Sequence, residues 1–427
     1  MLHVLLPLLV LTTCFFAYIS SWVSTTSMSI GGIARDATLF GVICFLPTFR
    51  LLYEKCRILF ILMAVFALWC GFLIASGWET VAQAFGGVRL LACLGSASVA
   101  VVLLRLKATK ALLPAIIVAG TLCAGLGIAD VATNGEVLDE LGYREDYGTL
   151  DAGRILVRDE GGSRRAGGGI SDALDYGYLM GLFTLVFAQL AFRYKSNWAR
   201  ASFVVLTIVC AVSVLLSVTR GAFMALALAS LVLAGRRWTH LLGVLAALGL
   251  ISTLGVIIFP DLADALDRRL VHVDNTTQTS NNDRMTMAQE AIGIIATRPL
   301  GVGLGSQGSS ASRYAGSGVR PIETDWAVLA LALEAGWPGV LLFLSIVLVA
   351  LFEIYAASGR ESLFYVLAFG VYWFFSAQFS NAMINSVNGI MFWLILVSAL
   401  RTKPGLVAAE IAPSTVEAKM VPALARS

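Results

Sequence analysis

The sequence has few charged residues and little histidine. Of its 427 residues, 13% are charged and three are histidine, whereas 58% are hydrophobic and the mean hydropathy is +0.83. A soluble domain covers its surface with many more polar residues, so this composition excludes an ordinary soluble protein. Helices of about 20 apolar residues can cross a hydrocarbon core about 30 Å thick while pairing their own backbone groups. The composition therefore predicts an all-α protein, a polytopic membrane helical bundle.

Excess positive charge is also scarce. The formal net charge is +3, and Lys and Arg are scattered between the apolar runs. Proteins that bind nucleic acid concentrate these residues on one face, so we exclude nucleic acid as a partner. All seven cysteines lie in or beside apolar runs: Cys14, Cys44, Cys56, Cys70, Cys93, Cys123 and Cys210. Neither long polar loop can therefore hold a disulfide, no Cys/His group has the spacing of a metal site, and we expect no metal and no cofactor.

Apolar runs divide the chain into twelve expected membrane crossings. They span residues 2–20, 37–53, 57–77, 85–105, 110–130, 172–193, 198–218, 221–235, 238–259, 336–356, 361–380 and 386–402. The first run has no charged region before it and no convincing small-residue cleavage site after it, which favours a retained helix over a signal peptide. The second run is short and is flanked by Arg35 and Asp36, so its pattern is the weakest.

Short connections that carry Lys and Arg predict the orientation, because positive residues are retained on the cytoplasmic side. They follow the even-numbered crossings, at Arg50, Lys55, Arg57, Arg105, Lys107, Lys110, Arg193, Lys195, Arg200, Arg236, Arg237, Arg360, Arg401 and Lys403. Both termini are therefore expected in the cytoplasm. The loops 131–171 and 260–325 and the turn 218–220 then lie together on the extracytoplasmic face.

This topology gives six expected regions. They are N-terminal transmembrane helices (1–130), an extracytoplasmic loop (131–171), central transmembrane helices (172–259), a large extracytoplasmic catalytic loop (260–325), C-terminal transmembrane helices (326–403) and a cytoplasmic tail (404–427). The tail holds three of the ten prolines and shows no periodic pattern, which predicts disorder.

The loop 260–325 is the expected reaction chamber, because it is rich in charge between apolar runs. Residues 281–298 predict an amphipathic helix with Asp283 among its first residues, where the helix dipole favours an anion. Its expected apolar face consists of Met287, Ala288, Ala291, Ile292 and Ile295. Pro299 ends that helix, and the glycines 301, 303 and 305 follow as a flexible loop that can approach a ligand closely. This G-x-G-x-G is no nucleotide fingerprint, because it follows a helix where that motif requires a strand.

The loop 131–171 supports two interpretations. It is either a solvated connector with a glycine hinge at 167–169, or a lid over the chamber in which Arg164 or Arg165 touches phosphate or sugar. Some of it is expected to form strand or short helix.

Arg220 is the only charged residue between Ala201 and Ala234. A charge at the centre of a membrane helix costs roughly 2.5–3.5 kcal/mol on insertion scales, so an arginine at a membrane edge suggests a function. The alternative is a loop arginine that extends to lipid headgroups. Arg89, near the outer end of the fourth crossing, raises the same question.

Three groups of residues carry a resemblance to a known family. They are Ser217-Val218-Thr219-Arg220-Gly221-Ala222, then Arg284 followed by Pro299-Leu300-Gly301-Val302-Gly303, then Asp325-Trp326 followed by Glu334-Ala335-Gly336 and Gly339. In order and spacing they resemble the O-antigen ligase and polymerase superfamily of multipass bacterial proteins, over roughly residues 165–355. The resemblance implies a GT-C-like glycosyltransferase that acts without a metal on undecaprenyl-diphosphate-linked glycan at the outer leaflet of the inner membrane, with its active site facing the periplasm.

The same resemblance implies an acceptor glycan, the bilayer, a flippase and a chain-length regulator as partners. One departure from the family pattern bears on the activity. Ligases that join O-antigen to lipid A core have a histidine at the position that aligns with Asp325, usually followed by asparagine, whereas Trp326 follows here. We therefore expect a polymerase of O-antigen or exopolysaccharide repeat units, with an O-antigen ligase as the alternative.

The chemistry of glycan transfer matches the residue types. A diphosphate is a stable leaving group, so the reaction needs cations for the developing charge and a group that accepts the proton of the acceptor hydroxyl. Arg220 and Arg284 fit the first need, because arginine pairs bidentately with phosphate oxygens, and Asp325 fits the second. A single inverting displacement is the simplest course. Further candidate substrate-binding residues are Arg89, Arg165, Arg313 and Arg320.

The sequence leaves open other roles for Arg284 and Asp325 and other functions for the protein. Arg284 could pair with Asp283 or Glu290, and Asp325 could cap a helix starting at Trp326. A transporter or flippase would also have many helices, but it would place substrate residues near the bilayer midplane, often in two related halves, and the sequence shows no internal repeat. A non-catalytic assembly subunit is the third possibility.

Overall fold

The computed structural model describes residues 2–15, 30–46, 48–76, 81–141, 159–160, 163–168, 170, 173–235, 275–306, 324–384 and 386–400. This part of the chain is almost entirely helical. Its main helices are α1 (Leu2–Cys14), α3 (Ile30–Phe45), α4 (Thr48–Lys55), α5 (Arg57–Ala75), α6 (Val81–Arg105), α7 (Leu112–Ala132), α9 (Ala173–Arg193), α10 (Asn197–Leu216), α11 (Arg220–Ala234), α14 (Asn275–Thr297), α16 (Ala327–Ser358), α17 (Leu363–Phe379) and α18 (Ser386–Ser398). The prediction of an all-α polytopic membrane protein is confirmed.

Six helices of the described ranges are long and apolar enough to cross a membrane. They are α5, α7 with the 3-10 turn before it, α9, α10, α16, and α17 with the 3-10 turn before it. The pair of α3 and α4, which is bent by 57°, makes a seventh if it is one span. Shorter apolar helices include α1, α11 and most of α18, and the predicted crossing 238–259 lies outside the described residues. The total of twelve stays a prediction.

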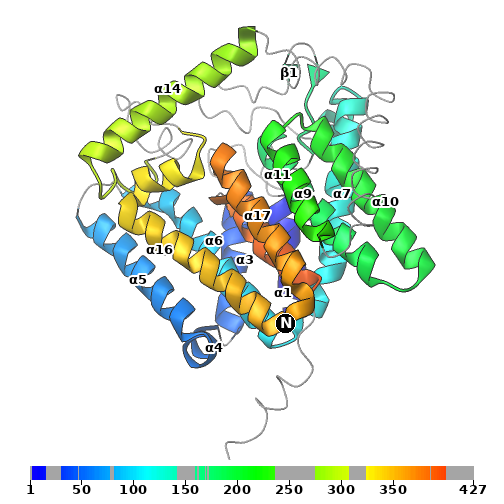
Figure 1. The fold of residues 1–427 in the computed structure, drawn as a ribbon, viewed down its shortest axis with the longest axis horizontal. Coiled ribbons are helices and arrows are strands. Elements are labelled where there is room, and N and C mark those ends of the chain that lie inside the picture. Colours follow the sequence, from blue (N-terminus) through cyan, green and yellow to red (C-terminus); the bar gives the residue numbers. More distant parts are fainter. Residues whose placement is uncertain are drawn as a thin grey trace, which may run out of the picture.

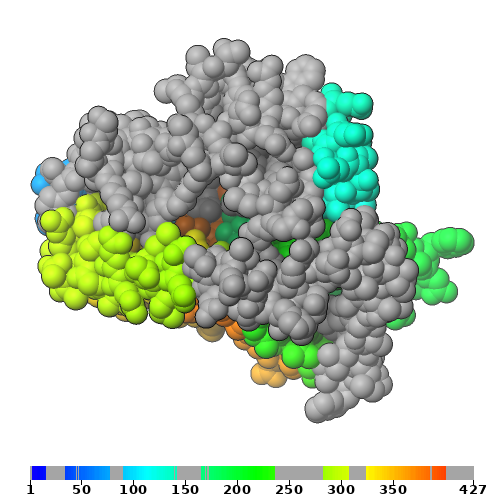
Figure 2. Space-filling view, turned by 90° about the horizontal axis from the view of Figure 1, so that it is seen from above, coloured from blue at the N-terminus to red at the C-terminus, as the bar shows by residue number. Residues whose placement is uncertain are grey.

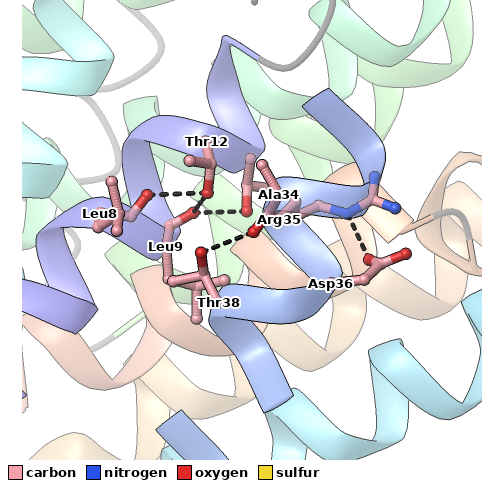
Figure 3. Close-up of polar contacts among 8 residues, drawn as sticks. Leu8, Leu9, Thr12, Ala34, Arg35, Asp36 and Thr38 are labelled. Carbon is pink, nitrogen blue, oxygen red and sulfur yellow. Dashed lines mark hydrogen bonds and ion pairs between the residues drawn. The ribbon is translucent and has the colours of Figure 1, made fainter. Parts of the chain in front are cut away.

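Helix α3, which covers the start of the weakest predicted crossing, contains an ion pair between the two residues that flank that run. The Nε atom of Arg35 lies 2.8 Å from Oδ1 of Asp36, and the Arg35 residue is 7% exposed. Figure 3 shows the guanidinium of Arg35 turned towards that carboxylate, while the threonine hydroxyls of Thr12 and Thr38 donate to carbonyls of their own helices. A charged side chain among apolar helices is costly unless it is paired. The pair therefore lets α3 continue through its charged residues.

The bundle has two ends that differ in structure (Figure 1). Helix α14 lies across one end, on the same side as the short strand β1, and α4 lies at the other. We call them the α14 end and the α4 end. Figure 2 looks onto the α14 end, with α14 along one edge of the molecule. Helix α14 packs on α16, and this contact ties it to the bundle.

Helix α9 is the most enclosed of the long apolar helices. In its most apolar stretch 78% of the residues are buried inside the protein, compared with 22% in α5. It packs against α10, α11 and α18. Burial on all sides is typical of a helix at the centre of a membrane bundle, whereas α5 has a lipid-facing position. Side chains near the start of α9 therefore project towards the neighbouring helices.

The loop 131–171 has some local structure, as expected. It contains the short helix α8 (Glu136–Glu140) and a two-stranded antiparallel hairpin of β1 (Asp159–Glu160) and β2 (Ser163–Arg164). Asp159 is paired in register with Arg164. The side chain of Arg164 lies outside the described part of the structure.

Helix α16 is broken at Gly336, and the chain that follows α14 inserts at the break. Gly336 has a φ of 67°, which leaves neighbouring backbone groups without partners inside the helix. The N–H of Val302 donates to the carbonyl of Leu333 (2.6 Å), and the N–H of Trp337 donates to the carbonyl of Pro299 (3.0 Å). Buried backbone groups in a membrane protein need such partners. Helix α16 begins at Ala327, and its part after the break at Gly336 contains the predicted tenth crossing, 336–356.

The two glycines at this junction touch each other. Gly301 has a φ of 92°, and a Cβ on it would lie 2.7 Å from the backbone nitrogen of Gly336. The indole Nε1 of Trp69 on α5 closes the other side of the break by donating to the carbonyl of Ala335 (2.8 Å). At Gly301 the structure shows a close approach to the backbone of α16, and the predicted approach of the glycine loop to a ligand stays a prediction. The junction fixes α14 relative to the start of α16.

Candidate active site

An ion pair joins two of the predicted site residues across the α14 end. The Nε atom of Arg284 on α14 lies 2.8 Å from Oδ2 of Asp325, which stands just before α16. Their side chains are 48% and 38% exposed, so both stay accessible from outside the bundle. The glycine junction between the two helices explains why residues so far apart in sequence meet.

The structure does not show the alternative roles that the sequence left open for Arg284 and Asp325. Arg284 pairs with Asp325, and no ion pair with the predicted alternatives Asp283 or Glu290 occurs among the described residues. Helix α16 begins at Ala327 with Trp326 as its N-cap, and no side chain caps that end. The N–H of Trp326 donates instead to the hydroxyl of Thr324 (3.3 Å). Asp325 is therefore an ion-pair partner, and its predicted role as a helix cap is not observed.

Helix α14 differs from its prediction at one end. It begins at Asn275, so Asp283 lies inside the helix and not in its first turn. The predicted favourable interaction of Asp283 with the helix dipole is therefore wrong, since that effect is confined to the first turn. The predicted apolar face is confirmed at Ala288, Ala291 and Ile295, which are buried, whereas Ile292 is 51% exposed. This face packs the helix down and leaves Arg284 on the accessible side.

Arg220 is the first residue of α11 and follows a strained turn. Val218 has a φ of 51°, a value that β-branched residues rarely adopt because of steric cost. The turn reverses the chain between α10 and α11 and brings Arg220 to the α14 end, within electrostatic range of Arg284. Arg220 is partly buried. Two guanidinium groups that repel each other are thus held near one another, which favours an anion between them.

Arg165 supports the turn before Arg220. Its Nε donates to the carbonyl of Ser217 (2.9 Å) and its Nη2 to the hydroxyl of Thr219 (3.2 Å). The neighbouring N–H of Gly167 donates to the buried carboxylate of Asp130 at the end of α7 (3.1 Å). Arg165 therefore contacts protein atoms in this structure, and its contact with phosphate or sugar, which belonged to one of the two interpretations of the loop, stays a prediction. The structure places Arg165 against the turn, where it bonds Ser217 and Thr219.

The sequence analysis missed polar residues at the start of α9. The hydroxyl of Tyr178 interacts electrostatically with Arg284, Asp325 and Asp175, so it lies at the same end of the bundle. The amide Nδ2 of Asn388 on α18 donates to the carbonyl oxygen and to Oδ1 of Asp175 (3.2 and 3.1 Å). Asp175 and Tyr178 stand one turn apart in an apolar helix, and that spacing was the available signal.

Three further candidates cannot be placed in this cluster. Arg89 belongs to α6, but its side chain lies outside the described residues, as do Arg313 and Arg320 entirely. Among the described residues no group of three His, Cys, Asp or Glu side chains could hold a metal ion. The described cluster thus offers two guanidinium groups, the carboxylate of Asp325 paired with one of them, the carboxylate of Asp175 and a phenol. Such a set can bind a multiply charged anion and accept a proton beside it.

Comparisons with known proteins match the part of the chain that carries the cluster. Residues 204–344 match a family model described as O-antigen ligase. The chain is also 27% identical over 285 residues to a protein named O-antigen polymerase from Salmonella muenchen, and the aligned region covers 64% of this chain and 69% of that protein. The family match contains Arg220, Arg284, Asp325 and the break at Gly336.

Proposed function

Because this chain belongs to the O-antigen ligase and polymerase superfamily, we propose that it is a membrane glycosyltransferase that polymerises polysaccharide repeat units. It transfers a glycan from undecaprenyl diphosphate to a hydroxyl of an acceptor glycan. The reaction takes place on the periplasmic side of a bacterial inner membrane, and both termini lie in the cytoplasm. The observation that carries the proposal is the accessible pair of Arg284 and Asp325 beside Arg220 at the α14 end.

The ion pair suggests how binding prepares the reaction. In the structure the carboxylate of Asp325 neutralises Arg284. A diphosphate competes for this guanidinium with more charge and more oxygen atoms, and arginine forms bidentate bonds with phosphate. When Arg284 turns to the diphosphate, Asp325 loses its partner and is free to accept a proton. Substrate binding and activation of the base are then one event.

The transfer step is a single displacement. The acceptor oxygen forms a bond to the anomeric carbon as the bond from that carbon to the phosphate oxygen breaks. The proton of the acceptor hydroxyl moves to Asp325, and the bonding electrons leave with the diphosphate. Arg220 and Arg284 stabilise the charge that develops on the leaving group, which electrostatic catalysis requires. The anomeric configuration is inverted, and no metal takes part.

A polymerase is the preferred activity of the two that the family contains. The similar protein from Salmonella muenchen is named O-antigen polymerase, and this chain has Asp325 where ligases have histidine. The matched family model, which is described as O-antigen ligase, keeps ligation of O-antigen to lipid A core as the second candidate. Both activities use the same donor, so they differ in the acceptor. A flippase and a chain-length regulator are the partners that a polymerase requires.

The length of lipid-linked glycans in cells tests the proposal. Mass spectrometry of lipid extracts from cells that lack the protein should find single repeat units on undecaprenyl diphosphate. Accumulation of finished chains on the lipid would indicate the ligase. Normal chains in normal amounts would contradict both activities. Restoration by the wild-type protein and not by an Asp325→Ala variant of equal abundance would place the activity in this chain.

A further inference from the structure

The N-terminus of α11 leaves backbone donors unbonded at the candidate active site. Thr219 is the N-cap of this 15-residue helix, and its side chain makes no capping hydrogen bond. The first-turn N–H groups of Gly221 and Ala222 have no acceptor among the described residues, whereas the N–H of Phe223 is bonded to the carbonyl of Thr219 (3.1 Å). Unbonded N–H groups and the helix dipole make such an end favourable for an anion.

A buried phenol lies against this same turn. Tyr178 is fully buried, and its hydroxyl has no hydrogen-bond partner within the described structure. A Cβ on Gly221 would lie 2.3 Å from the Tyr178 hydroxyl oxygen, so the phenol occupies the space that a side chain at 221 would fill. Buried hydroxyls are normally bonded, and leaving one unbonded has a cost. The free hydroxyl therefore points to an acceptor that a ligand brings.

Neighbouring helices hold the phenol in this position. The hydroxyl of Tyr372 on α17 donates to the carbonyl of Tyr178 (2.8 Å). A Cβ on Gly177 would lie 2.4 Å from the hydroxyl oxygen of Ser217, which shows how closely α9 packs on the turn before α11. On the opposite side, Phe379 packs against Gly221. The hydroxyl and the helix end thus form one fixed arrangement.

The charges around this arrangement select the ligand. The phenol and the two amides are donors, and Arg220 and Arg284 are cations nearby. The carboxylates of Asp325 and Asp175 are also charged neighbours of the phenol, and they already accept from Arg284 and from Asn388. A ligand that satisfies this set must supply acceptors that carry negative charge, as the oxygens of a diphosphate do.

We propose that the Tyr178 hydroxyl and the first-turn amides of α11 form an anion subsite that binds oxygens of the lipid-linked diphosphate. The inference rests on the proposed function, because the donor lipid supplies the anion. Tyr178 donates to a diphosphate oxygen, and it keeps donating as negative charge moves to that diphosphate during transfer. Gly221 is required because any side chain there would collide with the phenol.

Binding of undecaprenyl diphosphate without glycan tests the subsite in the purified full-length protein. The variant is Tyr178→Phe, which removes only the hydroxyl. Tyr365→Phe is the matched control, because Tyr365 is also buried with an unbonded hydroxyl in the described structure but lies near the start of α17, where Arg193 is its charged neighbour. We expect Tyr178→Phe to raise the Kd about ten- to hundredfold and Tyr365→Phe to leave it unchanged.

Thermal unfolding without ligand completes the test. Both variants remove an unbonded buried hydroxyl, so neither should unfold at a lower temperature than the wild type. A lower unfolding temperature of Tyr178→Phe alone would reveal a structural bond and overturn the subsite. An unchanged Kd of Tyr178→Phe, together with a raised Kd of Arg284→Ala, would overturn the subsite and leave the proposed function standing. Absence of binding to the wild type would overturn the proposed donor and the subsite together.

Discussion

Two arginine–carboxylate pairs stand at opposite ends of this bundle, and they have different surroundings. At the α4 end, Nη2 of Arg105 lies 2.6 Å from Oε2 of Glu353, with side chains 13% and 16% exposed. At the α14 end, the Arg284 and Asp325 side chains are 48% and 38% exposed at 2.8 Å. Similar contact distances therefore conceal different roles. The pair of Arg105 and Glu353, which we call the enclosed pair, joins α6 to α16. The pair of Arg284 and Asp325, which we call the open pair, is accessible enough to exchange a partner for a ligand.

The surroundings of Glu353 reinforce this difference. The thiol of Cys56 donates to the same carboxylate oxygen at 3.5 Å, so Glu353 has two protein donors. Burial raises the pKa of the Cys56 thiol to about 12, which keeps the thiol protonated as a donor. The α4 end thus satisfies its carboxylate from within the protein. At the α14 end, by contrast, the described partner of the Asp325 carboxylate is a guanidinium that is itself accessible from outside the bundle.

The largest expected effect is the loss of activity when the two site arginines become lysine. Arg220→Lys and Arg284→Lys keep the charge but lose the planar pair of donors that binds phosphate. Polymer formation should fall at least about tenfold for each variant at unchanged protein level. Arg50→Lys serves as the control, because Arg50 is an exposed residue of α4. Wild-type amounts of polymer from both site variants would contradict phosphate binding by these arginines and leave the open pair with a structural role, like that of the enclosed pair.

Breaking the enclosed pair should lower the free energy of unfolding more than breaking the open pair, which reverses the order expected for activity. Glu353→Ala leaves Arg105 buried without its partner and should lower the free energy of unfolding by about 3–5 kcal/mol. Asp325→Ala breaks an exposed pair, which contributes about 0–1 kcal/mol. Unfolding in detergent by circular dichroism compares the two. Equal losses of stability would show that exposure does not distinguish these pairs.

The glycine junction should link stability to activity at the α14 end. A Cβ at Gly336 would lie 2.4 Å from the backbone of Leu300, and alanine is strained at a φ of 67°. Gly336→Ala should therefore lower the free energy of unfolding by about 1–3 kcal/mol. It should also lower polymer formation, because Arg284 and Asp325 would no longer be held opposite each other. Gly293→Ala on α14 is the control, since a Cβ there meets no atom within 4 Å. Normal activity of Gly336→Ala would show that activity does not depend on the glycine junction.

Arg165 should give the smallest effect. Arg165→Ala removes two hydrogen bonds that hold the turn before Arg220, but it leaves both site arginines in place. We expect the maximal rate to fall about three- to tenfold with little change in the apparent KM for the donor. A large rise in that KM, measured with purified protein, would instead return Arg165 to the lid that the sequence suggested.

The sequence predicted the elements of the site better than their contacts. Hydropathy located the helices, charge in apolar surroundings singled out Arg220, and the family resemblance singled out Arg284 and Asp325. The junction of Gly301 with Gly336 could not be predicted, because it is a backbone contact between residues distant in sequence and hydropathy does not encode it. Tyr178 was missed because a tyrosine in an apolar helix has the pattern of a packing residue. Its spacing of one turn from Asp175 was the signal in the sequence, and the structure adds its unbonded hydroxyl.

The rate of polymer formation by an Asp325→Asn variant tests the proposed reaction most directly. Asparagine keeps the size of the side chain and an oxygen that can accept from Arg284, but it cannot take a proton from the acceptor hydroxyl. We predict the order Asp > His > Asn ≈ Ala at this position, with histidine recovering some turnover because it accepts a proton near neutral pH. Full-length polymer from Asp325→Asn at the wild-type rate would contradict the role of Asp325 as the base.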